Sequence, residues 1–263
     1  MVRPQHFVVA AFAFIGLASA QQLPANAAHG YLDTRALPNS LSLLPPPPAL
    51  RSGGFARDEA IAASVAALRG TSRWARAASD ADLKFPHAAA TFACASGITI
   101  SQTTTPHLYA LLERIMIDVG LSTYAAKNHY QRTRPFVELN TTTCEPSDEA
   151  MLRHDGSYPS GHSAVGWAWA LILTEIAPDH TDAILARGRD FGESRIICNA
   201  HWQSDVDAGR VIAAATVARL HADPAFLTDL IAAREEIAMA RTHGAHPSKN
   251  TCDAEAASLR REP

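Results

Sequence analysis

Hydrophobic residues after position 56 recur mostly at intervals of three and four, which places them on one face of an α-helix. The longest such pattern follows Thr105-Pro106, a capping residue and a first-turn proline. Its apolar face consists of Leu108, Leu111, Leu112, Ile115 and Val119. The pattern predicts a helix that runs towards Lys127, can bend at Gly120 and ends before Arg134-Pro135, because a residue before proline avoids the α region.

The same reasoning predicts a series of further helices separated by glycine and proline stops. They span residues 57–68, 74–83, 160–176, 182–191, 205–220 and 224–240, and the last of them closes the fold. The polar–apolar alternation that marks β-strands is nearly absent, and the sequence has no internal repeat. We therefore predict an all-α, compact, single-domain helical bundle over residues 57–263.

Residues 21–56 precede that bundle and differ from it in composition. They contain Pro24, Pro38, the run Pro45–Pro48 and Gly53-Gly54, which favour extended, polyproline-like chain and turns over helix. We expect this extended Pro-rich segment to wrap around the helical domain. For about its first dozen residues, a disordered tail is an equally good interpretation.

The first 20 residues have the features of a secretory signal peptide. Arg3 precedes an apolar run from Phe7 to Leu17, and Ala18-Ser19-Ala20 fits the small-residue cleavage pattern. A membrane anchor is the alternative, but neither this run nor any later one reaches the ~18 apolar residues that a bilayer span needs. We predict a periplasmic or secreted protein that starts near Gln21 and has no membrane segment in its mature form.

Composition narrows the possible functions. The chain has 263 residues, 47% of them hydrophobic, and a formal net charge of −3. Such a charge excludes the broad cationic surface that non-specific nucleic-acid binding needs. The four cysteines, Cys94, Cys144, Cys198 and Cys252, fit two disulfides in an exported protein, and all three pairings stay open. Their spacing does not match a zinc site, and Cys198 has the alternative of a structural thiol.

A first group of candidate chemical residues lies in the stretch GSYPSGH at positions 156–162. Ser160 is placed to cap the following helix, whose first N–H groups and dipole attract anions. Gly161 leaves room for an anion such as phosphate to reach those amides, and His162 could transfer a proton to it. A capped helix with an incidental histidine is the alternative interpretation of this stretch alone.

A second group combines Lys127 with Arg134. Their separation corresponds to about two helical turns, so both side chains point the same way if the helix continues. Lysine supplies a point charge and arginine a planar fork that matches two phosphate oxygens. The alternative is a solvated basic helix end.

A third group contains Arg195, His201 and Asp205. Ser204 and Asp207 resemble a capping box, so a helix is expected to begin near Asp205 and to leave His201 in the preceding turn. Asp205 could then hold one ring nitrogen of His201 and leave the other free as a nucleophile. A purely structural His–Asp hydrogen bond is the alternative.

Taken together, the three groups favour phosphoryl transfer. They supply two guanidinium groups, an ammonium group, a helix N-terminus, a histidine held by an aspartate and a second histidine. Because no carboxylate cluster accompanies them, we expect neither a metal nor another cofactor.

The three groups, in this order, resemble the type-2 phosphatidic acid phosphatase superfamily. Its pattern is Lys, six residues, Arg-Pro; then Pro-Ser-Gly-His; then Ser-Arg, five residues, His, three residues, Asp. The chain matches it at Lys127–Pro135, Pro159–His162 and Ser194–Asp205. The stretches GSYPSGH, LPPPP, ALRGTSRW and HWQSDVDAGR are similar to the class A bacterial non-specific acid phosphatases of that superfamily.

The resemblance implies a periplasmic, metal-independent acid phosphatase with an all-α fold, which is expected to form homo-oligomers. It implies that His201 forms a phosphohistidine, that Asp205 orients His201, and that His162 protonates the leaving alcohol. The residues implied to hold the phosphoryl oxygens are Lys127, Arg134, Ser160, Gly161 and Arg195. Small phosphate esters, including nucleotides, are the expected partners, and phosphate transfer to other alcohols is an expected side activity.

Two positions depart from the pattern of the relatives. Ser163 follows His162 where threonine is frequent, and Ile117 stands where a glutamate is frequent, which puts any function of that carboxylate in doubt. A vanadate-dependent haloperoxidase is the main alternative, because vanadate has the geometry of phosphate. A membrane lipid phosphatase lacks the expected spans, and a non-catalytic phosphate-binding protein would not need the full set of titratable groups.

Overall fold

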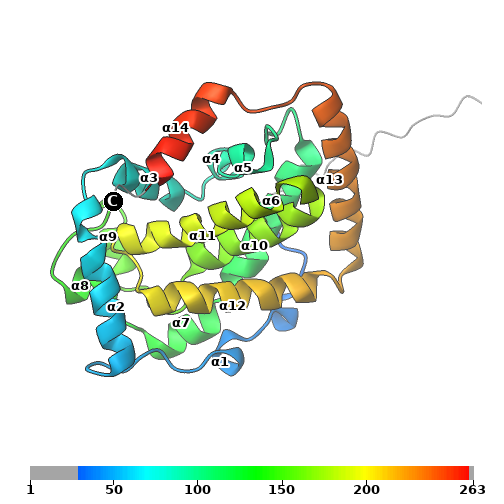
Figure 1. The fold of residues 1–263 in the computed structure, drawn as a ribbon. Coiled ribbons are helices and arrows are strands. Elements are labelled where there is room, and N and C mark those ends of the chain that lie inside the picture. The colour runs from blue at the N-terminus through cyan, green and yellow to red at the C-terminus, as the bar shows by residue number, and fades with distance from the viewer. Residues whose placement is uncertain (1–28, 261–263) are drawn as a thin grey trace, which may run out of the picture.

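The computed structural model describes residues 29–260, and every regular element in that range is a helix (Figure 1). The α-helices are α1 (Ser40–Leu43), α2 (Gly53–Ser64), α3 (Ser72–Ala81), α4 (His87–Ala90), α5 (Ala93–Ser96), α6 (Pro106–Ser122), α7 (Tyr124–Tyr130), α8 (Pro135–Glu138), α9 (Glu149–Leu152), α10 (Gly161–Ile176), α11 (Thr181–Ile197), α12 (Gln203–Leu220), α13 (Pro224–Thr242) and α14 (Lys249–Leu259). Short 3₁₀ turns are Thr34–Ala36, Ala66–Leu68 and Pro178–His180. The all-α prediction is confirmed, whereas the predicted signal peptide lies outside the described residues.

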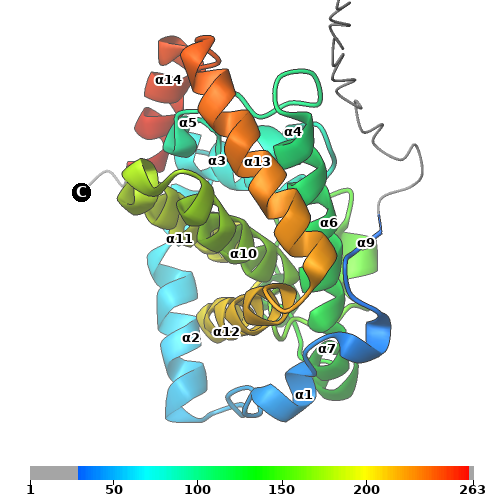
Figure 2. The ribbon, with the colours of Figure 1, turned by 90° about the vertical axis from the view of Figure 1, so that its right-hand side faces the viewer.

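Helix α10 lies at the centre of the molecule, in contact with α6, α11, α12 and α13 (Figure 2). It is apolar on nearly all sides, and a helix with that composition is stable only where neighbours cover it. Trp169 is fully buried within this core, and its indole N–H donates to the Leu112 carbonyl of α6 at 2.9 Å. The central position of α10 fixes its first turn, which carries the predicted anion-binding residues.

Two glycines allow the helices next to α10 to approach closely. A Cβ on Gly188 of α11 would lie 2.5 Å from the Cβ of Ala170, and one on Gly209 of α12 would lie 2.5 Å from the Ser160 carbonyl oxygen. Real Cβ atoms do not make contacts this short, so glycine is required at both positions. The start of α10 is therefore packed directly against the helix that carries Asp205.

Several predicted helix boundaries were wrong because capping side chains were not recognised. Helix α2 begins at Gly53 rather than at residue 57, since Ser52 Oγ accepts from the Phe55 N–H at 3.2 Å. Helix α12 begins at Gln203, two residues before the predicted start, with Trp202 as the N-cap residue and no capping box from Ser204. The carboxylate of Asp205 instead accepts from the Trp202 N–H at 2.8 Å.

Other differences concern helix length and number. The helix predicted towards Lys127 is two helices, α6 and α7, and the break is at Thr123 rather than Gly120. Helix α11 continues to Ile197 instead of stopping at residue 191, which places Arg195 inside a helix. Helix α14 follows α13, so the fold does not close at residue 240.

The disulfides choose among the three open pairings. Cys94 is bonded to Cys252, which attaches α14 to α5, and Cys144 is bonded to Cys198 at the end of α11. The alternative of a structural thiol at Cys198 is therefore wrong.

The N-terminal segment contacts the helical domain from its first described residues. The backbone N–H groups of Tyr31 and Leu32 donate to the Asp118 carboxylate of α6 at 2.7 and 3.2 Å. Ser40, at the start of α1, donates its hydroxyl to the Thr123 carbonyl at 3.2 Å. Helix α1 lies beside α7 (Figure 2). Pro45–Pro48 lie outside helices, as expected, but α1 and the first residues of α2 are helical where extended chain was predicted. Across residues 29–260, none of the helices has the length and apolar character that crossing a membrane requires.

Candidate active site

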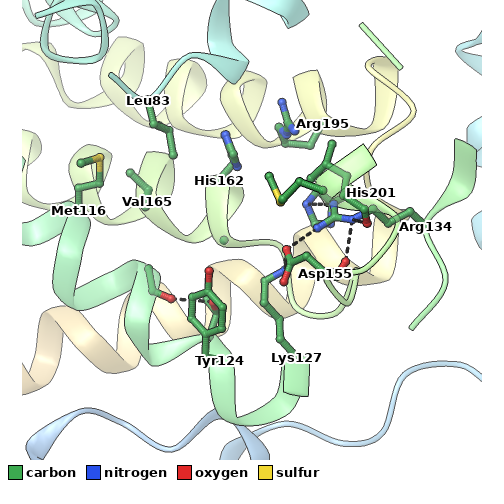
Figure 3. Close-up of a pocket in the computed structure, with 15 residues that line it drawn as sticks. Leu83, Met116, Tyr124, Lys127, Arg134, Asp155, His162, Val165, Arg195 and His201 are labelled. Carbon is green, nitrogen blue, oxygen red and sulfur yellow. Dashed lines mark hydrogen bonds and ion pairs between the residues drawn. The ribbon is translucent and has the colours of Figure 1, made fainter. Parts of the chain in front are cut away.

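A cavity of about 470 Å³ opens at the N-terminal end of α10. Six of the predicted site residues line it: Lys127, Arg134, Gly161, His162, Arg195 and His201. Segments from α7, α10 and α11 and the turn before α12 thus converge on one space, as the three sequence groups predicted. On the other side of His162 the wall is apolar, with Leu83, Met116 and Val165 (Figure 3).

The two remaining predicted residues, Ser160 and Asp205, are buried directly behind the cavity wall. Ser160 Oγ accepts hydrogen bonds from the backbone N–H and the hydroxyl of Ser163, at 3.3 and 2.9 Å, and so caps α10. Its backbone N–H donates to the Asp205 carbonyl at 2.9 Å. Serine at position 163, one of the two departures from the relatives, thus supports the cap with its hydroxyl. Ile117, the other departure, does not line the cavity, although its neighbour Met116 does.

His201 is held in one orientation by the backbone of the GSYPSGH stretch. Its Nδ1 lies 2.8 Å from the Ser157 carbonyl oxygen, which can only accept, so Nδ1 carries the proton and Nε2 presents its lone pair. Arg134 Nη1 donates to that Nε2 at 3.0 Å. Burial, followed by the charges of Arg134 and Lys127, lowers the pKa of His201 well below its ordinary value. The imidazole is therefore neutral, as a nucleophile must be.

Asp205 contributes to this orientation less directly than expected. Its Oδ2 is 3.5 Å from His201 Nδ1, longer than a good hydrogen bond, but only 2.5 Å from Ser157 Oγ. Arg132 donates to Oδ1 at 2.6 Å and also bonds Asp58 of α2 at 2.7 Å. Asp205 therefore fixes the loop at Ser157, and the loop carbonyl fixes the histidine.

Sequence reasoning did not assign roles to Ser157, Arg132 or Asp58. Ser157 and Arg132 lie inside the quoted sequence groups, so their positions were a usable signal. Asp58 lies about 70 residues before Arg132, and its place in this network depends on how α2 packs against α12.

His162 forms the boundary between the polar and apolar halves of the cavity (Figure 3). Its Nε2 donates to the Ala81 carbonyl at 3.0 Å, which leaves Nδ1 as the nitrogen available for proton transfer. Burial, then the charge of Arg195, lowers its pKa well below the ordinary histidine value. Acidic solution or a bound anion is needed to protonate it.

Lys127 and Arg134 are buried cations with different supports. Lys127 Nζ donates to the Gly156 carbonyl at 2.6 Å and to Asp155 at 3.2 Å. Burial, followed by the charge of Arg134, lowers the pKa of Lys127 to about 8. Arg134 is held by backbone carbonyls and also donates Nη2 to Asp155 at 2.8 Å. The sequence places the pair His154-Asp155 directly before the GSYPSGH stretch, which favours a position at the cavity entrance; Asp155 lines the cavity, whereas His154 does not.

Arg195 differs from the other two cations. Its side chain is 1% exposed, and its Nη2 donates to Glu145 at 2.6 Å. Nε and Nη1 are buried without a hydrogen-bond partner among residues 29–260. Unpaired buried donors are costly, and these two belong to a side chain that lines the cavity, so an anion bound there would satisfy them.

The geometry of the cavity agrees with the family and the relatives to which the chain is similar. The family model described as PAP2 superfamily matches residues 107–228, which contain all the predicted site residues. A non-specific acid phosphatase of Providencia stuartii is 45% identical over 209 residues, which are 79% of this chain and 84% of the relative. The chain belongs to the acid phosphatases of the PAP2 superfamily.

Other relatives support the same assignment. A non-specific acid phosphatase of Salmonella typhimurium is 44% identical over 200 residues, 76% of this chain and 80% of the relative. An acid phosphatase of Zymomonas mobilis is 42% identical over 219 residues, 82% of this chain and 81% of the relative. As a PAP2 acid phosphatase, the protein hydrolyses phosphate esters, and the cavity at α10 is lined by the cations Lys127, Arg134 and Arg195.

Proposed function

We propose that this acid phosphatase is a periplasmic or secreted, metal-independent phosphomonoesterase that works through a phosphohistidine on His201. One observation carries the proposal: a single cavity contains a neutral histidine with a defined nucleophilic nitrogen and a buried guanidinium, that of Arg195, with two unpaired donors. A phosphoryl group between them would satisfy Arg195 and present phosphorus to Nε2. The predicted signal peptide supports the location.

In the first step, the Nε2 lone pair of His201 exchanges its contact with Arg134 for a bond to phosphorus. The phosphorus–oxygen ester bond breaks, and its electron pair leaves with the alcohol oxygen, which takes the Nδ1 proton of protonated His162. The imidazole of His201 becomes cationic, and the Ser157 carbonyl and Asp205 stabilise it from the Nδ1 side. The cations Lys127, Arg134 and Arg195 stabilise the charge that spreads over the phosphoryl oxygens.

In the second step, water attacks phosphorus and the nitrogen–phosphorus bond breaks, which restores His201. Neutral His162 takes the proton of that water, so both histidines return to their starting states. An alcohol in place of water would yield a new ester, which is the predicted phosphotransferase side activity. Because the pKa of His162 is lowered, the first step is expected to proceed best in acid.

The apolar wall indicates which esters bind well. Leu83, Met116 and Val165 lie on the side of His162 that the leaving group must occupy, and half-exposed Tyr124 also lines the cavity. An alcohol with an apolar or aromatic body would bury that surface favourably. Aryl phosphates are therefore the expected good substrates; hydrolysis of nucleotides and formation of homo-oligomers stay predictions from the family resemblance.

The decisive experiment measures hydrolysis of a simple aryl phosphate in excess chelator, with wild type and His201→Ala. We expect full wild-type activity and a loss of at least about 10³-fold in the variant. Mass spectrometry after an alkaline quench should find the phosphoryl group on the peptide that contains His201. Loss of wild-type activity with chelator, or retention of turnover in the variant, contradicts the proposal. Halide oxidation with peroxide and vanadate would instead support the haloperoxidase alternative.

A further inference from the structure

Asp155 places a carboxylate in contact with two of the cations that the proposed function assigns to phosphoryl oxygens. Its Oδ2 is 2.8 Å from Arg134 Nη2 and 3.2 Å from Lys127 Nζ, so one oxygen bridges both groups (Figure 3). The side chain lines the cavity. A phosphoryl oxygen that contacted the same donors would take the position of this carboxylate oxygen.

The bridge is not needed to hold Arg134 in place. Its Nε donates to the backbone carbonyls of Leu152 and Asp155, at 3.0 and 2.9 Å, and its Nη1 donates to the Ala200 carbonyl at 3.0 Å. These bonds come from the main chain and would remain if the Asp155 side chain rotated away.

Lys127 is also supported independently, because its Nζ donates to the Gly156 carbonyl at 2.6 Å. Neither cation therefore depends on the Asp155 carboxylate for its position. What the carboxylate adds is negative charge next to two buried positive groups.

Glu145 provides an internal comparison. It contacts Nη2 of Arg195 and does not line the cavity, and the other two donors of that guanidinium have no partner in the described part of the chain. Asp155 lies in the cavity, and its side chain is 26% exposed, which gives it access to solvent. One carboxylate thus supports a cation from behind, and the other competes for cations at the front.

We propose that Asp155 is an internal counter-ion that competes with the phosphoryl group for Lys127 and Arg134 and so weakens the binding of the phosphate product. This inference rests on the proposed function of the site. Each phosphate that binds displaces the carboxylate, and the return of the carboxylate assists its departure. Without this competition, tightly bound phosphate would leave slowly and limit turnover. Binding energy that stabilises the ground state and the transition state equally does not accelerate the reaction.

The test is the affinity of inorganic phosphate, measured by titration calorimetry at pH 5 for wild type and Asp155→Asn. The variant retains shape and loses the charge, so phosphate should bind about tenfold more tightly. In steady-state assays with an aryl phosphate, KM and the inhibition constant of phosphate should fall together, and kcat should fall because product leaves more slowly. Asp148→Asn is a matched control, since this exposed carboxylate of the same segment has no contact with the cavity.

Asp155→Ala separates competition from positioning. If the carboxylate competes, removing the whole side chain also tightens phosphate binding. If it positions the cations, both variants bind phosphate more weakly and KM rises. Equal or weaker binding in Asp155→Asn overturns the inference while leaving the proposed function intact. Absence of phosphate binding to wild type would instead contradict the proposed function itself.

Discussion

Two arginines of helix α11, about two turns apart, are both almost completely buried but have opposite surroundings. Arg187 is 2% exposed and forms a two-point ion pair with Asp80, at 3.0 and 2.5 Å, while its Nε lies 3.4 Å from Glu255. Burial lowers its pKa, but Asp80 and its neighbours outweigh burial, and the pKa is raised. Arg195 is 1% exposed and, within residues 29–260, has one carboxylate partner and two unpaired nitrogens.

Under the proposed function, the difference distinguishes a structural cation, Arg187, from a functional one, Arg195. A buried charge that the protein neutralises completely holds elements together, here α3, α11 and α14. A buried charge left partly unpaired costs stability, and such a cost is tolerated where a ligand provides the missing partner. Two arginines on one helix can thus serve different purposes, and the partners of each guanidinium indicate which purpose it serves.

The largest effect should follow from Arg195→Met, which removes the two unpaired donors. We expect kcat/KM for an aryl phosphate to fall about 10²- to 10³-fold, the cost of losing preorganised donors to transition-state charge. The thermal midpoint should fall less than in the same substitution at Arg187, because the variant breaks one ion pair, with Glu145, but also removes two unpaired buried donors. A large loss of stability with intact activity would instead show that Arg195 is a structural cation.

The same substitution at Arg187 should do the opposite. It leaves Asp80 buried without its guanidinium partner, so the free energy of unfolding should fall by about 3–5 kcal/mol. Denaturant unfolding measures this loss. For the folded fraction, kcat/KM should stay within about threefold of wild type, since Arg187 does not line the cavity. A loss of kcat/KM equal to that of Arg195→Met would refute the distinction.

A smaller effect concerns the pH dependence. Arg195 is the largest charge effect on His162 after burial, and it lowers the pKa of that imidazole. Because a positive neighbour disfavours imidazolium, its removal raises the pKa, and the proton donor stays charged to higher pH. In Arg195→Met, the alkaline fall of kcat/KM should therefore move upward, by up to about one pH unit.

Arg187→Met, assayed well below its unfolding temperature, is the control for that shift and should keep the wild-type profile. A shift of the same size in both variants would show that the effect does not come from charge next to His162.

The sequence predicted the convergence of the site but not its counter-ions. Motif spacing was sufficient to predict that Lys127, Arg134 and Arg195 lie in one cavity. The ion pairs of Asp155 and Glu145 were missed, since a single carboxylate in a loop has no recognisable pattern until tertiary structure places it beside a cation.

The same limit applies to the fold. Hydrophobic periodicity identified the long helices, whereas the start of α2 and the break at Thr123 depend on local caps and packing. Helix α14 was missed because it has few buried residues and is attached through Cys252 and Glu255.

The smallest predicted effect tests Lys127, which is intermediate between the two arginines because it has partners but faces the cavity. Its pKa is lowered to about 8, so the ammonium is charged below that value and neutral above it. As the pH rises through about 8, one of three cations is lost, and KM for an aryl phosphate should rise about tenfold. Lys127→Arg should abolish this rise, since guanidinium stays charged.

Substitution of Asp155 provides a second test of the rise in KM with pH. Its carboxylate raises the pKa of Lys127, so Asp155→Asn should lower that pKa and move the rise in KM below pH 8. The same variant is expected to bind phosphate more tightly at pH 5, where Lys127 is charged in both proteins. Tighter phosphate binding at pH 5, together with a rise in KM that begins at lower pH, is a combination that a general disturbance of the site would not produce. If the rise in KM stays at the same pH in both Lys127→Arg and Asp155→Asn, a group other than Lys127 is responsible for it.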